Sequence, residues 1–268
     1  MSSSFQLDGQ GPAAYERYLV PRLFATCADQ LLDLVAVTAG DRVVDLACGT
    51  GIVARRAAAA VGAGGAVVGV DVNDGMLAVA SALTDGTPVL RWCKADATAV
   101  PLSDGDFDKV CCQQGLQFFP DRPLAVREAH RLLAPGGRIG LAVWRSLEHH
   151  PVYALLVDAL ERHVGAEAAD MMRAPFEGPD GAALRDLLTD AGFGRPVVRI
   201  GAITARFPSP REFLRQEVVS TPLAEPVGAL GTARLDALVT DLDRALTPYT
   251  DDEGMIVPMQ TWLATAVR

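Results

Sequence analysis

The stretch Val43-Val44-Asp45-Leu46-Ala47-Cys48-Gly49-Thr50-Gly51 decides the fold of this 268-residue chain. Its first half is a short run of apolar, largely β-branched residues, which is typical of a buried strand. The two glycines then make a tight turn, and an alanine-rich helix is expected from Ile52 to about Val61. A strand, a glycine turn and a helix in this order indicate the start of an open α/β sheet.

The same alternation continues down the chain and predicts a doubly wound, mostly parallel sheet. Because crossovers between parallel strands are right-handed, the connecting helices should cover both faces. Asn73 or Asp74 is the expected N-cap of the second helix, since both side chains can accept from free backbone N–H groups. The further strands are expected at residues 66–71, 89–93, 107–112 and 138–144, and the helices at 74–83 and 123–133.

The segments before and after this core are mostly helical. A helix over residues 15–37 should be interrupted at Pro21, because proline clashes with the preceding turn. After Trp144 we expect helices at 146–175, 180–191 and 208–247, the last broken at Pro222 and Pro226, and strands at 195–207 and 254–268, the final one antiparallel. The prediction is one domain over residues 1–268, with an N-terminal helical segment (1–39), a core (40–145), a helical cap (146–180 and 208–248) and the rest of the sheet (181–207 and 249–268).

Composition excludes several classes of protein. The net charge of −9 argues against nucleic-acid or membrane-surface partners, and no apolar run is long enough for a membrane helix. Without a basic segment followed by an apolar run we expect no signal peptide, hence a cytoplasmic protein. The five cysteines include no CxxC pair, so we expect free thiols and no metal site. Lys94 and Lys109 are the only lysines among many arginines, which favours a bacterial source.

Three carboxylates, Asp45, Asp71 and Asp96, are expected at the ends of three successive strands. The turn itself, Gly49-x-Gly51-x-x-Ala54, matches a dinucleotide fingerprint with alanine in the third position, and could hold a pyrophosphate or a carboxylate. Asp45 would repel a pyrophosphate but suits an ammonium group. Asp71 can accept from both ribose hydroxyls and Asp96 from an adenine amino group. The three acids therefore fit adenosine that carries a cationic amino-acid tail.

Taken together, these segments resemble the class I S-adenosylmethionine-dependent methyltransferases. Residues 43–51 resemble motif I of that family, 69–77 the segment after it and 94–102 the adenine-contacting loop. Phe107-Asp108-Lys109-Val110, residues 113–118 and Leu132-Leu133-Ala134-Pro135-Gly136-Gly137-Arg138 complete the set, which is most similar to the ubiquinone/menaquinone-biosynthesis type (methyltransferase type 11) branch. The resemblance implies a Rossmann-like, doubly wound, seven-stranded sheet, mostly parallel with an antiparallel last strand, and helical cap insertions.

The resemblance also implies a role for each cofactor-binding position. Gly49, Thr50 and Gly51 would hold the methionine portion, Asp71 the ribose, and Asp96 with the N–H of Ala97 the adenine, on whose face Met76 would pack. Cys112 and Gln113 would contact the amino-acid portion, and Tyr15 would close over the cofactor as part of a lid formed by residues 1–39. The cofactor-contacting positions expected are Tyr15, Asp45, Ala47, Gly49, Thr50, Gly51, Asp71, Val72, Met76, Asp96, Ala97, Cys112 and Gln113.

Other residues near the expected pocket have two possible interpretations each. Gln113, Gln114 and Gln117 either position the substrate or cofactor or belong to a solvated loop, and Gln114, Gln117 and Phe118 are the candidates for the acceptor pocket. His149 and His150 are candidates for a general base, because histidine titrates near neutrality, or they lie in a solvated loop. Cys48 is either a nucleophile activated at a helix N-terminus or a packing residue, and we favour packing.

The sequence thus predicts methyl transfer by in-line displacement to the O, N or C atom of a small molecule, such as a specialised metabolite or a quinone-like compound. S-adenosylhomocysteine would be the product, and no metal is expected. Two alternatives remain at this point. One is an NAD(P)-dependent oxidoreductase, which does not explain Asp45 and Asp96. The other is a protein of this fold that binds S-adenosylmethionine without transferring its methyl, for example a cyclisation catalyst. The sequence patterns do not distinguish a monomer from a homodimer.

Overall fold

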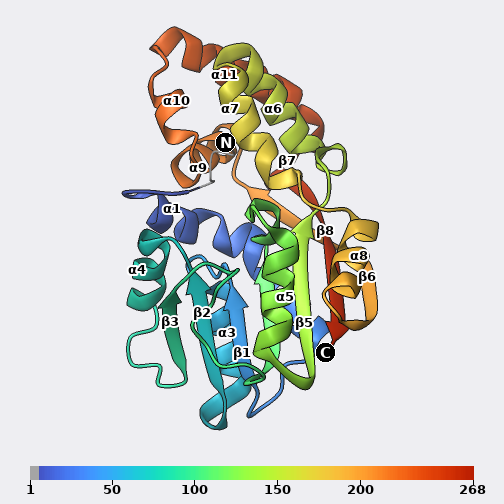
Figure 1. Ribbon diagram of the computed structural model, residues 1–268. Coiled ribbons are helices and arrows are strands. Elements are labelled where there is room, and N and C mark those ends of the chain that lie inside the picture. Colours follow the sequence, from blue (N-terminus) through green and yellow to red (C-terminus); the bar gives the residue numbers. More distant parts are fainter. Residues whose placement is uncertain (1–5) are drawn as a thin grey trace.

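The computed structural model describes residues 6–268 (Figure 1). Its centre is a sheet that contains the predicted strand–turn–helix unit. The strand order is β3-β2-β1-β4-β5-β8-β6. Strands β1 to β5 are parallel, whereas β8 lies antiparallel between β5 and β6. The bounds are β1 Arg42–Leu46, β2 Ala66–Asp71, β3 Leu90–Lys94, β4 Phe107–Gln113, β5 Leu133–Trp144, β6 Gly194–Phe207, β7 Thr250–Asp251 and β8 Gly254–Val267. The doubly wound sheet and the antiparallel last strand are confirmed. Within residues 6–268, the two-residue β7, which pairs with β8, adds an eighth strand to the expected seven.

Helices cover both faces of this sheet, as right-handed crossovers require. One face packs on α2 (Ala25–Val35) and α3 (Ile52–Val61), and the other on α5 (Arg122–Leu132) and α8 (Gly181–Asp190). Alternate strand residues serve the two cores, so that Cys111 points to the first face and Cys112 to the second. Helix α4 (Asp74–Ala82) flanks β2 and β3.

The N-terminal helix is interrupted where Pro21 predicts it. Helix α1 (Gly11–Tyr18) ends before the π-helical turn η1 (Val20–Phe24), which contains Pro21, and α2 follows at Ala25. The break lets α1 leave the face of the sheet, so that it packs against α4 and against α9 (Pro210–Ser220). Residues 1–5 of the predicted lid segment lie outside the described residues.

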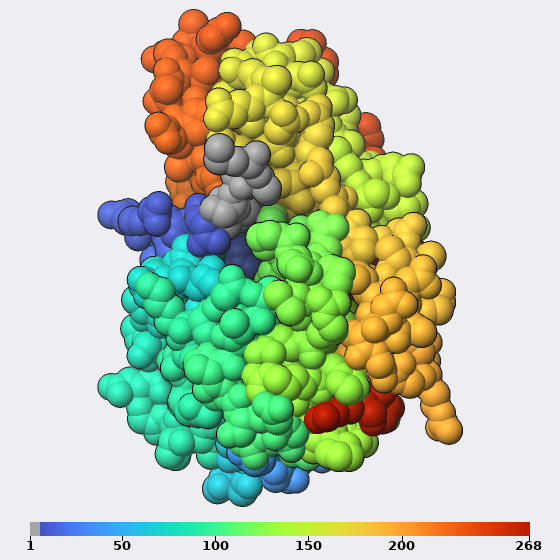
Figure 2. Space-filling model, in the orientation of Figure 1, coloured from blue at the N-terminus to red at the C-terminus, as the bar shows by residue number. Residues whose placement is uncertain are grey.

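A second group of helices lies over the carboxyl ends of the parallel strands, at the top of Figure 1. We call it the helical lobe, and in the space-filling view its yellow and orange atoms form the upper part of the molecule (Figure 2). Its own core includes Ile203 and Phe207 of β6 and Met255 and Val257 of β8, so these two long strands join it to the sheet. The helical lobe comprises α6 (Pro151–His163), α7 (Ala166–Arg173), α9, α10 (Ala224–Gly228) and α11 (Thr232–Ala245). Short 3-10 turns complete the chain: η2 Gly62–Gly64, η3 Leu116–Phe118, η4 Leu147–His149, η5 Ala174–Phe176 and η6 Thr247–Tyr249.

Two local predictions need correction. Pro226 does not break a helix but lies inside α10, in its first turn, where the missing N–H of proline removes no intrahelical hydrogen bond. Strand β5 begins at Leu133 rather than at Arg138, and the expected turn is kept within it as an irregularity, with Gly136 at φ +80° and a register shift opposite Phe107. Neither change alters the position of the strand ends that face the helical lobe.

Candidate cofactor and acceptor site

One cavity of about 360 Å³ lies between the carboxyl ends of the parallel strands and the helical lobe. Asp45, Gly49 and Asp71 line its sheet side, and Tyr153 and Glu217 line its helical side. Carboxyl ends of parallel strands are where open α/β sheets bind ligands. The cavity is large enough for a ligand that contacts both sides.

The glycine turn after β1 has a backbone that only glycine adopts readily. Gly49 has φ +54° and Gly51 has φ +86°, both in the left-handed region. A Cβ at Gly51 would lie 2.2 Å from Cη2 of Trp92, so the turn also needs a residue without a side chain there. The N–H of Gly49 donates to Asp71 Oδ2 at 2.8 Å, which ties the turn to the end of β2.

Asp45 is the most buried carboxylate at the sheet side, with 1% of its surface exposed. Its Oδ2 accepts from the N–H of Ala54 at 3.0 Å, whereas its Oδ1 is buried without a partner among residues 6–268. Burial, and to a smaller extent the nearby Asp71, raises the pKa of Asp45 to about 8. A buried carboxylate with a free oxygen is a site for a cationic group.

Asp71, at the end of β2, has partners for both oxygens. Its Oδ1 accepts from the N–H of Asn73 at 2.9 Å, while its Oδ2 holds the Gly49 N–H. Burial raises the pKa of Asp71 as well. The side-chain amide of Asn73 donates to the carbonyl of Leu7 at 3.0 Å, which holds the N-terminal segment over this part of the cavity. Each carboxylate oxygen retains a lone pair for a ligand hydroxyl.

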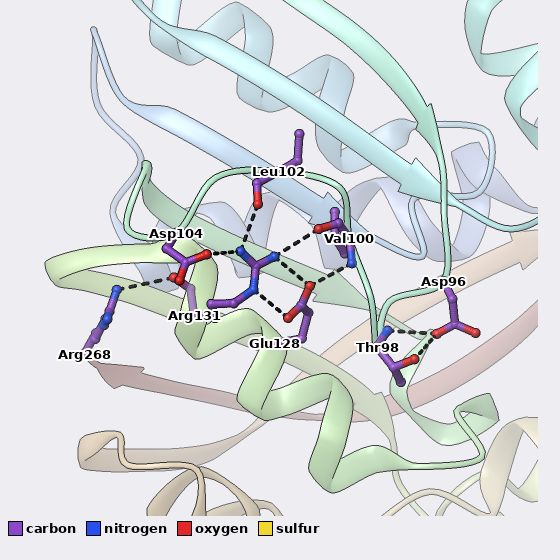
Figure 3. A network of polar contacts seen from close by, with 8 residues as sticks. All are labelled: Asp96, Thr98, Val100, Leu102, Asp104, Glu128, Arg131 and Arg268. Atoms are coloured by element: carbon purple, nitrogen blue, oxygen red, sulfur yellow. Dashed lines mark hydrogen bonds and ion pairs between the residues drawn. The ribbon is translucent and has the colours of Figure 1, made fainter.

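The loop after β3 brings Asp96 and Ala97 to the cavity, and Figure 3 shows how it is held. Asp96 Oδ1 accepts from the N–H of Thr98 at 2.8 Å and from its hydroxyl at 2.6 Å. Further along, Arg131 of α5 donates to the carbonyls of Val100 at 3.0 Å and Leu102 at 2.8 Å. Glu128 of α5 accepts from the N–H of Val100 at 2.7 Å. Two side chains of one helix therefore fix the path of this loop.

Carboxyl groups lie on both the sheet side and the helical side of the cavity. Its wall contains four carboxyl groups, those of Asp45, Asp71, Asp96 and Glu217, and over the described part of the chain no Lys, Arg or His lines it. Such a wall attracts cations and disfavours anions, because low-dielectric surroundings strengthen both effects. A pyrophosphate group would meet repulsion here, whereas a sulfonium or ammonium group would not.

The side facing the helical lobe is aromatic. The ring of Tyr15 lies 5.0 Å from that of Phe24, which lies 6.1 Å from that of Trp144. The ring of Tyr153 lies 5.2 Å from that of Phe176. Burial raises the pKa of Tyr15, so this hydroxyl stays protonated. These rings give the helical side of the cavity an apolar surface of the kind that planar organic molecules bind.

Known proteins share both the motifs and the fold. A family described as "Methyltransferase domain" matches residues 44–141. The ubiquinone/menaquinone biosynthesis C-methyltransferase of Chromobacterium violaceum is 34% identical over 169 residues, which cover 59% of this chain and 69% of that protein.

This chain belongs to the class I S-adenosylmethionine-dependent methyltransferases of the ubiquinone/menaquinone type. The 2-phytyl-1,4-naphtoquinone methyltransferase of Thermosynechococcus vestitus is 39% identical over 110 residues, 41% of this chain, and the match spans only about half (49%) of that protein. The phosphoethanolamine N-methyltransferase 2 of Haemonchus contortus, solved with S-adenosyl-L-methionine, matches with a TM-score of 0.61 at 20% identity over 97% of this chain and 57% of that chain. That likeness confirms the fold.

The residues predicted from the sequence fall into two groups in this methyltransferase. Some do not line the cavity: Thr50 is buried, Gly51 lies against Trp92, and Cys112 faces α5. The predicted residues that do line it are Tyr15, Asp45, Ala47, Gly49, Asp71, Val72, Met76, Asp96, Ala97, Gln113, Gln114, Gln117 and Phe118. Cys48 also lines it, and burial raises the pKa of its thiol, which fits packing better than nucleophilic attack.

The two histidines do not line the cavity of the methyltransferase. His150 is buried, and its ring lies 4.7 Å from that of Phe176. Burial lowers the pKa of His150 to about 4. His149 lies in the turn before α6, where its Nε2 is 2.8 Å from Nη2 of Arg145. Neither ring is placed to meet a group bound in the cavity.

The glutamines after β4 form a buried polar cluster rather than a solvated loop. Gln113 donates to the carbonyl of Phe24 at 3.1 Å, and Gln114 accepts from the N–H of Trp144 at 2.7 Å. The side-chain oxygens of Gln113 and Gln117 are buried without a partner within residues 6–268. Two unpaired acceptors on a cavity wall mark places where a ligand can donate hydrogen bonds.

The pair Tyr153 and Glu217, which was not among the predicted residues, lines the cavity from the helical side. The Tyr153 hydroxyl donates to Glu217 Oε1 at 2.8 Å. A signal was present, because Glu217 follows Phe213 and Leu214 by four and three positions and therefore shares their buried helix face. An acid on the apolar face of a helix is uncommon without a function or a partner.

Proposed function

We propose that this protein transfers the methyl group of S-adenosylmethionine to a neutral small-molecule acceptor inside the cavity. The observation that carries the proposal is the wall of the cavity. It contains carboxyl groups and, among residues 6–268, no basic side chain, and it continues into an aromatic surface. A cationic cosubstrate fits the first part and an apolar ring fits the second. Family membership gives the reaction class.

The residues present fit the cosubstrate. The unpaired Oδ1 of Asp45 suits its ammonium group, and Asp71 suits the two ribose hydroxyls. Asp96 and the N–H of Ala97 suit the edge of the adenine, and Met76 suits its face. Tyr15 lies where it would cover the bound molecule, between the acidic and aromatic parts of the cavity.

S-adenosylmethionine supplies a methyl group activated by its sulfonium: a nucleophile attacks the methyl carbon in line, and S-adenosylhomocysteine leaves with the electron pair of the broken S–C bond. The protein then has to hold two ligands in one orientation and exclude water. The buried carboxylates and the aromatic rings perform these tasks. Since curated relatives are named as quinone methyltransferases, a quinone-like ring is the acceptor we favour.

Thermal shift measurements with S-adenosylmethionine, S-adenosylhomocysteine, NADH and NADPH test the cofactor. A ligand that binds only the folded protein raises the melting temperature by mass action. We expect stabilisation by the two S-adenosyl compounds alone. Stabilisation by a nicotinamide nucleotide alone would refute the proposal. Mass spectrometry of the products separates methyl transfer, which adds about 14 Da, from a rearrangement that adds nothing.

A further inference from the structure

The Tyr153–Glu217 pair joins two helices of the helical lobe at the wall of the cavity. Tyr153 belongs to α6 and Glu217 to α9, and Glu217 is 2% exposed. Aromatic rings surround the pair, with Phe176 at 5.2 Å and Phe213 at 5.6 Å from the ring of Tyr153. A carboxyl group in such surroundings loses most of its hydration, which costs free energy.

The pair does not satisfy the carboxyl group by itself. Glu217 Oε1 accepts from Tyr153, and over the described residues the side chain has no second hydrogen-bond partner and no ion pair. A role in joining the helices would not need an acid, since an amide accepts the same hydrogen bond without the cost of a buried charge. The second oxygen is therefore available to a ligand in the cavity.

The surroundings of Glu217 also set its proton affinity. Burial raises the pKa of Glu217 to about 7, against the opposing effect of the hydrogen bond from Tyr153. Helix α9 packs against α1, α10, α11 and β6, yet among the described residues Tyr153 is the only titratable group that acts on Glu217. Arg215 and Glu212 pair with each other on the exposed side of α9. A base with a pKa near the working pH is the most effective proton acceptor.

We propose that Glu217 is the general base of the methyl transfer, with Tyr153 as the residue that positions its carboxylate. This inference rests on the proposed function. The acceptor is a neutral molecule with a weakly acidic hydroxyl on an apolar ring, and its hydroxyl donates to the free oxygen of Glu217. Because the cavity wall is acidic, an acceptor with its own carboxylate should bind poorly.

The proton and electron balance is complete with these groups. As the acceptor O–H bond breaks, its proton passes to Glu217. For methylation at oxygen, the electron pair left on oxygen forms the new bond to the methyl carbon. For methylation of the ring, a conjugated carbon forms that bond. Glu217 then returns its proton to the oxygen, which restores the hydroxyl, and the methylated ring carbon loses its proton to water. In both cases the electron pair of the broken S–C bond stays on sulfur, and one proton leaves with the products.

The test uses the full chain as wild type, E217Q, Y153F and the surface control E212Q. The probe is 1,4-dihydroxynaphthalene kept reduced under anaerobic conditions, with 1,4-dimethoxynaphthalene and 1,4-dihydroxy-2-naphthoate as matched probes. Calorimetry measures S-adenosylhomocysteine binding to each protein, and then binding of each probe to the loaded protein. Kinetics with S-adenosylmethionine give kcat/KM from pH 5.5 to 9.

We expect all four proteins to bind S-adenosylhomocysteine alike, and the wild type to bind the dihydroxy compound at least tenfold more tightly than either matched probe. E217Q should lose about 10²- to 10⁴-fold in kcat/KM, together with the rise in rate near pH 7. Y153F should lose less than tenfold and move that rise to higher pH, because a hydrogen bond that favours the carboxylate is gone. E212Q should match the wild type.

Two results would overturn the inference while the proposed function stands. One is binding of S-adenosylhomocysteine without binding or turnover of 1,4-dihydroxynaphthalene. The other is an E217Q protein whose kcat/KM and pH profile match those of the wild type. If E217Q does not fold, the pH shift of Y153F decides, and an unshifted profile refutes the role of Glu217. A wild type that does not bind S-adenosylhomocysteine would instead refute the proposed function itself.

Discussion

The backbone N–H of Gly49 donates a 2.8 Å hydrogen bond to Asp71 Oδ2, so the side chain that ends β2 also fixes the turn that follows β1. Both residues line the cavity. The carboxylate that we assign to the ribose is thus also a structural part of the turn that would approach the methionine portion. Loss of this side chain should affect ligand binding in two ways, directly and through the turn.

Asp71→Ala should therefore weaken binding of S-adenosylhomocysteine by about 1.5–3 kcal/mol for each charge-assisted hydrogen bond lost. Asp71→Asn should weaken it less, because its amide oxygen can still accept from the N–H of Gly49. Calorimetry measures both affinities. The control is Asp74→Ala, which removes an exposed carboxylate paired with Lys94 outside the cavity. An unchanged affinity of a folded Asp71→Ala protein would contradict the ribose assignment.

The two glycines of the turn should differ in their tolerance of alanine. Gly51→Ala has both a left-handed φ and a clash with Trp92 at 2.2 Å, and should cost about 2–4 kcal/mol of unfolding free energy. Gly49→Ala has the same kind of φ, but no heavy atom of residues 6–268 lies within 4 Å of the added Cβ, and it should cost about 1–2 kcal/mol. Urea unfolding measures both. An equal or reversed order would show that Trp92 does not limit the turn.

Local sequence signals were sufficient to predict the sheet and the carboxylates at the ends of its strands. Apolar strands, the glycine turn and Asp45, Asp71 and Asp96 lie within residues 40–100, and each signal depends on close neighbours in the chain. The fold and the family follow from these signals and are confirmed.

The residues on the helical side of the cavity could not be predicted from such local signals. Tyr153 and Glu217 are 64 residues apart in sequence and meet only because α6 and α9 pack in the helical lobe. His149 and His150 show the opposite case, because they have the chemistry of a base but point away from the cavity. His150 packs against Phe176, and His149 lies against Arg145. The sequence pattern gives the type of each residue, but the direction in which its side chain points depends on tertiary packing.

Asp45 should couple ligand binding to proton release. Its pKa of about 8 in the ligand-free protein means that it is mostly protonated at pH 6.5, whereas a bound ammonium group favours the carboxylate. Binding of S-adenosylhomocysteine at pH 6.5 should therefore release close to one proton, measured by calorimetry in two buffers of different ionisation enthalpy. Asp45→Asn should release none and bind more weakly. Equal proton release by both proteins would contradict the assignment.

The same carboxylate should make the ligand-free protein less stable as pH rises. The folded pKa is raised above the unfolded value of about 3.9, so the folded state binds the proton more tightly than the unfolded state. The cost of ionising Asp45 therefore grows from about pH 4 and is fully present above about pH 8. Asp45→Asn should melt at a higher temperature than the wild type at pH 8.5, with a smaller difference at pH 5. A wild-type advantage at pH 8.5 would contradict this sign.

Arg131 should influence cofactor binding from outside the cavity, because it holds the loop that carries Asp96 (Figure 3). Its ion pairs with Glu128 and Asp104 are partly exposed, so their loss alone should cost little stability. The two carbonyl contacts matter more, since they set the path of the loop beyond Thr98. Arg131→Met should lower the affinity for S-adenosylhomocysteine about three- to tenfold, or ~0.7–1.4 kcal/mol. The matched control is Arg127→Met, which removes an exposed arginine of the same helix. Hydrogen exchange of residues 95–104 should rise in Arg131→Met and stay unchanged in the control. Weaker binding without faster exchange in this loop would show that Arg131 acts by another route.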